Sequence, residues 1–103
     1  MSKQATIDYA QAAFEDLDRL AQFLAQHDSP FSGQLAVFIA KAITVLVIQP
    51  GIGRPVGEGY RELIIHHGRS GYLVRYRYHR DQQIVTILRI RHQSESGYTA
   101  DEI

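Results

Sequence analysis

The last third of the chain carries side chains that could cleave RNA. Cleavage by attack of the 2′-hydroxyl needs a base, an acid for the leaving oxygen, and cations for the charge that develops. His92, Glu95 and Tyr98 are able to transfer protons. Arg75 is one of several arginines that could supply positive charge. These residues are candidates for a catalytic site, but nothing in the sequence brings them to one phosphate, so binding without catalysis is favoured.

Metal-ion and thiol chemistry have little support. The chain has five histidines and no cysteine, so disulfides and thiolate ligands are excluded. His66 and His67 are neighbours in an expected strand and should face opposite ways, which prevents both from binding one ion. No two histidines stand one turn apart on an expected helix. We therefore expect no metal ion and no other cofactor.

Positive charge gathers in the second half of a chain whose formal net charge is zero. Residues 51–92 hold eight arginines and three acidic residues. Such a basic half suits an anionic partner, although a solvated sheet face explains it equally well. The side chains expected to form a basic, target-binding face are Arg61, Arg75, Arg77, Arg89, Arg91 and His92.

Three consecutive strands are expected to position these arginines, near residues 60–67, 70–79 and 83–92. Because side chains alternate along a strand, the pattern predicts one apolar sheet face and one arginine-rich face. The residues expected on the apolar face are Tyr72, Val74, Tyr76 and Tyr78 in the middle strand and Ile84, Thr86, Leu88 and Ile90 in the third.

Turn lengths should set the register of these strands. A two-residue turn at 68–69, with glycine first, places Glu62 opposite Arg75 as a cross-strand ion pair. A three-residue loop at 80–82 would keep the arginines of both strands on one face. It would place Arg75 opposite Ile87, so that like charges avoid direct opposition.

The first half of the chain is expected to hold a short strand and two helices. Residues 5–9 alternate in polarity and could form an edge strand. Between residues 10 and 26, apolar residues recur at intervals of three and four, which predicts an amphipathic helix. Its charged residues, Asp16 among them, lie mostly off the apolar stripe.

A second helix is expected between residues 30 and 49. Asp28 or Ser29 can cap it, Pro30 suits its first position, and Pro50 ends it. This segment is apolar on nearly every side, and a small domain cannot cover all of them. The uncovered side should meet another chain, although a central core helix or a strand pair would also explain the composition.

The order of these elements and four short motifs resemble the RelE/ParE toxin superfamily of type II toxin–antitoxin modules. The resemblance covers essentially the whole chain. It implies one α+β domain over residues 1–103, with a β-α-α-β-β-β order and a mostly antiparallel sheet. The resembling segments are Tyr60-Arg61-Glu62-Leu63, Ser70-Gly71-Tyr72, Tyr76-Arg77-Tyr78 and Arg91-His92-Gln93-Ser94-Glu95.

The resemblance also implies partners. In these modules a cognate antitoxin wraps the toxin and holds it inactive, and operator DNA is contacted only through the complex. A cytoplasmic protein without a membrane segment is expected, since no signal peptide or bilayer-length span is found. The residues expected to bind the antitoxin, all in the apolar second helix, are Val37, Ile39, Ile43 and Leu46.

Two branches of the superfamily differ in target. RelE-like members are ribosome-dependent mRNA endonucleases with an arginine after the Gly-Tyr of the middle strand, where this chain has Leu73. ParE-like members poison DNA gyrase by contact, and their last strand often ends as residues 89–92 do here. The resemblance thus favours a gyrase-binding toxin that arrests growth and stabilises plasmids. The alternatives are an mRNA endonuclease and a degenerate toxin that acts mainly in an antitoxin–operator complex.

Overall fold

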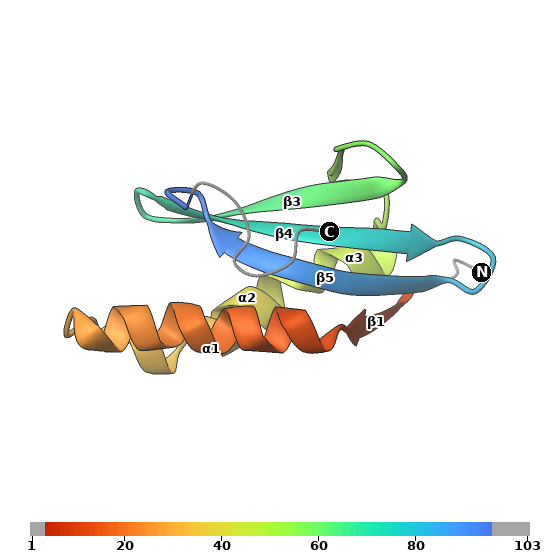
Figure 1. Cartoon of the computed structure of the whole chain (residues 1–103). Coiled ribbons are helices and arrows are strands. Elements are labelled where there is room, and N and C mark those ends of the chain that lie inside the picture. Colours follow the sequence, from red (N-terminus) through yellow and green to blue (C-terminus); the bar gives the residue numbers. More distant parts are fainter. Residues whose placement is uncertain (1–3, 96–103) are drawn as a thin grey trace.

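A five-stranded sheet forms the centre of the protein (Figure 1). The structure is a computed structural model that describes residues 4–95. Its elements are β1 Thr6–Tyr9, α1 Gln11–Gln26, the 3-10 helix η1 Pro30–Gly33, α2 Leu35–Ile43, α3 Val45–Ile48, β2 Arg54–Pro55, β3 Tyr60–His67, β4 Ser70–His79 and β5 Ile84–His92. The strands lie in the order β1-β5-β4-β3-β2, and the β1–β5 pair is parallel while the other pairs are antiparallel. The expected α+β order is confirmed, with the short β2 added.

The β3–β4 hairpin has the predicted register. His67 pairs with Ser70, which leaves a two-residue turn, and Glu62 stands opposite Arg75. Gly68 has a positive φ of 58°, a conformation that glycine adopts without a steric penalty. The residue type at this turn therefore fixes which side chains meet across the hairpin.

The predicted β4–β5 register is wrong. The loop holds four residues, 80–83, because His79 pairs with Ile84. A bulge at Leu88 then shifts the ladder, so that Arg75 faces Arg89 instead of Ile87. The even loop turns Val85 and Ile87 toward the core, and the extra residue returns Ile90 to the same side.

One face of the sheet packs against the helices, which lie beneath and behind it in the view of Figure 1. Leu35, Ile39, Ile43 and Leu46 repeat at helical spacing and are fully buried in this core. The expectation that Ile39, Ile43 and Leu46 face an antitoxin is therefore wrong, because their own sheet covers them. Val37, on another side of α2, is exposed.

The expected helix between residues 30 and 49 is divided into η1, α2 and α3. Ser29 caps η1 by accepting a hydrogen bond from the Phe31 amide. Thr44 separates α2 from α3 and donates its side-chain hydroxyl back to the Lys41 carbonyl, a bond that often bends helices. Of the described helices, none is both long and apolar enough to cross a bilayer.

Candidate functional site

Arg89 is buried in an ion pair and does not contribute to a solvent-facing basic surface. Its Nε lies 2.8 Å from Asp16 Oδ2, and its Nη2 lies 3.1 Å from Asp16 Oδ1. Asp16 also accepts the Ile90 amide proton at 2.8 Å, at the edge of β5 beyond its pairing with β1. Asp16 is thus buried and joins α1 to β5, contrary to the prediction that it lies off the packed stripe.

Arg75, a catalytic candidate, is held by a buried carboxylate. Glu62 Oε2 lies 3.7 Å from Arg75 Nη2, and Glu62 Oε1 lies 2.9 Å from Arg54 Nη2. Glu62 itself is buried, so its charge is balanced by two guanidinium groups in place of water. The predicted cross-strand pair between Glu62 and Arg75 is confirmed.

Two further arginines of the predicted basic face anchor the glycine-rich loop before β3. Arg61 Nη1 donates to the Gly53 carbonyl at 2.7 Å. Arg77 Nη2 donates to the Glu58 carbonyl at 2.7 Å, and its guanidinium lies 4.3 Å from the centre of the Tyr60 ring. Arg61 pairs across the hairpin with a core residue and so lies on the helix-covered face, whereas Arg77 lies on the opposite face.

The same loop is fastened to the core by Tyr76. Its hydroxyl donates to the Pro50 carbonyl at 2.8 Å and accepts from the Gly53 amide at 2.9 Å. A Cβ atom on Gly53 would lie 2.6 Å from that hydroxyl, so this position needs glycine. Burial raises the pKa of Tyr76, which keeps the hydroxyl protonated and able to donate.

Replacing Tyr76 with phenylalanine is expected to lower the free energy of unfolding by about 1–3 kcal/mol, because the Pro50 and Gly53 groups lose their partner. Urea unfolding followed by circular dichroism measures the change. Tyr78→Phe is the matched control, since within residues 4–95 the Tyr78 hydroxyl makes no hydrogen bond. Equal losses in both variants would contradict the anchoring role.

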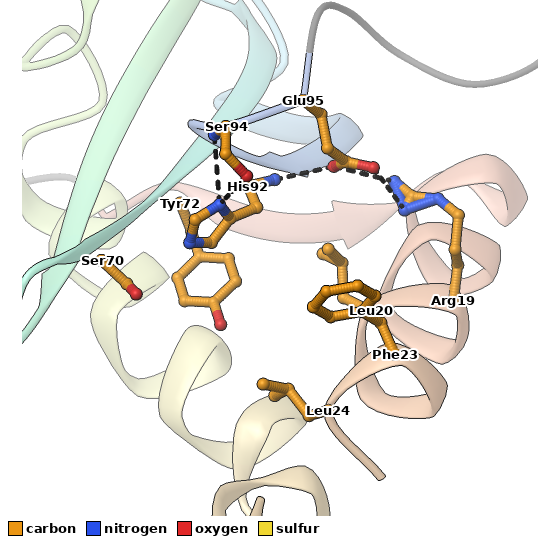
Figure 2. A pocket seen from close by; sticks show the side chains of 9 residues that line it. All are labelled: Arg19, Leu20, Phe23, Leu24, Ser70, Tyr72, His92, Ser94 and Glu95. Carbon is orange, nitrogen blue, oxygen red and sulfur yellow. Dashed lines mark hydrogen bonds and ion pairs between the residues drawn. The ribbon is translucent and has the colours of Figure 1, made fainter. Parts of the chain in front are cut away.

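His92 and Glu95 meet at a pocket of about 460 Å³ between α1 and the ends of β4 and β5 (Figure 2). His92 Nδ1 accepts from the Ser94 amide at 3.1 Å and lies 2.7 Å from Ser94 Oγ. Glu95 Oε1 accepts the His92 amide proton at 2.9 Å, and its other carboxylate oxygen lies 3.4 Å from Arg19 Nη1. The Glu95 carboxylate therefore fixes the turn at residues 92–95 and does not orient the His92 ring.

The predicted catalytic set is only partly brought together. His92 and Glu95 line the pocket, whereas Arg75 is not among its lining residues and is paired with Glu62. Arg91 Nη1 donates to the Glu95 carbonyl at 2.7 Å, and Tyr98 lies outside the described residues. Across residues 4–95, no group of three or more potential ligands is placed to hold a metal ion.

Sequence reasoning missed the contribution of α1 to this region. Asp16, Leu20 and Leu24 follow one another at the i, i+4 interval of one helix face. That spacing places Asp16 on the packed stripe and was the available signal. A carboxylate in line with packed leucines indicates that a cation from elsewhere in the chain pairs with it.

An exposed apolar surface lies on the outer side of α2 and α3. Val37 and Ile48 have 58% and 59% of their surface exposed, and Val45 is also exposed. We refer to these three residues as the α2–α3 surface. They, and not the buried set that the sequence had suggested, are the large apolar side chains of these two helices that are open to a partner.

The sequence matches the profile of a known family, described as ParE toxin of type II toxin-antitoxin system, parDE, over residues 7–97. The chain belongs to the ParE toxin family. This ParE-family toxin is 33% identical over 72 residues to Toxin RelE1 of Caulobacter vibrioides, a stretch covering 70% of the chain and 77% of that relative. Both findings confirm the resemblance to the RelE/ParE superfamily.

Two solved structures share the fold of the ParE-family toxin. A chain of the chromosomal ParDE system from P. aeruginosa superposes with a TM-score of 0.68 at 22% identity, covering 84% of this chain and 94% of that one. A chain of the toxin–antitoxin complex RelBE2 from Mycobacterium tuberculosis superposes with a TM-score of 0.59 at 22% identity, covering 92% and 98%. At these identities the likeness concerns the fold.

Proposed function

We propose that this ParE-family toxin arrests growth in the cytoplasm by binding DNA gyrase, and that a cognate antitoxin neutralises it. The observation that carries the proposal is the pairing of its arginines with groups of its own chain. Arg75 pairs with Glu62, and Arg89 pairs with Asp16. A guanidinium already paired with a carboxylate offers less stabilisation to a developing phosphorane charge. This arrangement favours action by contact over RNA cleavage.

The surroundings of His92 support the same choice. A nuclease needs a second proton-transfer group beside its base. The nearest carboxylate of the pocket, Glu95, is bound to Arg19 and to the His92 backbone amide. The ending of the last strand at residues 89–92 also resembles the gyrase-poisoning branch of the superfamily.

The sheet face opposite the helices is the proposed contact with gyrase. Arg77 and Arg91 lie there with Ile64, which is exposed, while Arg75 on the same face is paired with Glu62. A surface that mixes cations with apolar groups suits an acidic protein surface and speeds its association. On the other side of the molecule, the α2–α3 surface is the proposed contact with the antitoxin.

Two assays on one toxin preparation test the function. We expect the purified toxin to inhibit DNA supercoiling by gyrase, the antitoxin to relieve that inhibition, and mRNA on translating ribosomes to stay intact. Codon-periodic mRNA cuts that disappear in His92→Ala or Tyr98→Phe would reject gyrase binding in favour of an endonuclease. Normal growth during induced expression would instead identify a degenerate toxin.

A further inference from the structure

The pocket at the end of β5 has an apolar side and a polar side. Leu20, Phe23 and Leu24 of α1 form the apolar side. Tyr72 and Ser70 of β4 lie across from them (Figure 2). At about 460 Å³ the pocket is large enough for an aromatic side chain with its adjoining backbone.

The Tyr72 hydroxyl faces the open pocket and makes no hydrogen bond within residues 4–95. Tyr72 as a whole is only 3% exposed, because its ring is packed in the core. Figure 2 shows the hydroxyl directed into the pocket. The ring stands edge-on to His92, with their centres 5.2 Å apart, and this packing helps to hold it in place. Because this hydroxyl points into the pocket and can both donate and accept, it is placed to bind a polar atom of an occupant.

The charges at the pocket are already balanced. Arg19 lies 3.4 Å from both Asp16 Oδ1 and Glu95 Oε2. A phosphate would therefore have to compete with two carboxylates for this guanidinium, which disfavours a nucleic acid. An uncharged occupant leaves these ion pairs intact.

The rim of the pocket has the character of a protein contact. Phe23 is 57% exposed, and the centre of its ring lies 4.3 Å from the centre of the His27 ring. In protein interfaces, a few residues contribute most of the binding energy, and aromatic residues at well-packed pockets are common among them. An exposed aromatic, an apolar wall and one unpartnered hydroxyl together fit a side chain with an apolar body and a polar end.

We infer that this pocket receives an uncharged anchor side chain of the antitoxin, tyrosine being the residue type that fits best. The inference rests on the proposed neutralisation by an antitoxin and adds a contact separate from the α2–α3 surface. The phenol ring packs on Leu20, Phe23 and Leu24. Its hydroxyl bonds to that of Tyr72.

Calorimetric titration of the toxin with its cognate antitoxin tests the anchor. Tyr72→Phe should weaken binding roughly five- to tenfold, the effect of one lost hydrogen bond, and leave the stability of the toxin alone unchanged or raised. Phe23→Ala should weaken binding by at least about tenfold. Tyr76→Phe is the control on the same strand: it should lose stability and keep its affinity.

Binding of a small phenol tests the pocket independently of the rest of the interface. In ¹⁵N-labelled toxin, p-cresol should shift the amides of Ser70, Tyr72 and His92 saturably, and the antitoxin should displace it. Unchanged antitoxin affinity in both Tyr72→Phe and Phe23→Ala would overturn the anchor while leaving neutralisation standing. Shifts produced by oligouridylate but not by p-cresol would also overturn it. Failure of the wild-type toxin to bind the antitoxin would reject the proposed neutralisation and the anchor together.

Discussion

Replacing Asp16 with alanine should lower the free energy of unfolding by about 3–5 kcal/mol, which is a large part of the stability of a domain of this size. The substitution leaves the Arg89 guanidinium buried without the carboxylate that binds it through two nitrogens. It also removes the acceptor of the Ile90 amide. Urea unfolding of the two proteins, followed by circular dichroism, measures the difference.

Asp18→Ala is the matched control for this prediction. Asp18 is an exposed carboxylate on the same helix, and its loss should change stability by no more than about 0.5 kcal/mol. The double variant Asp16→Ala/Arg89→Met should recover much of the loss, because it no longer buries an unpaired charge. A single variant Asp16→Ala as stable as the wild type would show that the pair does not hold α1 to β5.

A carboxylate at Ile39 should unfold the protein, whereas one at Val37 should leave it folded and weaken antitoxin binding. Ile39 is fully buried, and an ionised side chain there costs several kcal/mol or more. Val37 is exposed on the α2–α3 surface, so Val37→Asp should change the free energy of unfolding by no more than about 0.5 kcal/mol. Circular dichroism distinguishes the two outcomes before any binding is measured.

The effect on binding needs a control for charge alone. Gln22→Asp places the same charge on an exposed position of α1. We expect calorimetric titration to show antitoxin affinity lowered by at least about tenfold in Val37→Asp and nearly unchanged in Gln22→Asp. Equal affinities for wild type and Val37→Asp would remove the α2–α3 surface from the interface.

Local signals predicted the β3–β4 hairpin, but they did not predict the β4–β5 register. Gly68 specified its turn because few other residues adopt its backbone conformation. In β5, residues 84–87 are β-branched on both faces, so alternation does not distinguish the core side from the outer side. Packing against Tyr76 and the bulge at Leu88 together determine which β5 side chains face the core.

The buried face of α2 was hidden for a related reason. With apolar residues on nearly every side, several stripes satisfy helical spacing, and only the position of the sheet selects the one through Ile39 and Ile43. The Asp16–Arg89 pair was beyond local reasoning, because its members are 73 positions apart. Carboxylates are usually exposed, so a buried one was not expected from its type alone.

The parallel pairing of β1 with β5 has a consequence for how the chain is made. Thr6 to Tyr9 align with Ile84 to Ile87, so β1 leaves the ribosome long before the strand that pairs with it. Such distant pairing slows folding and delays completion of the sheet until β5 has been made. A polypeptide released before Ile84 has neither this pairing nor the inner strand β5, so it cannot form the complete sheet.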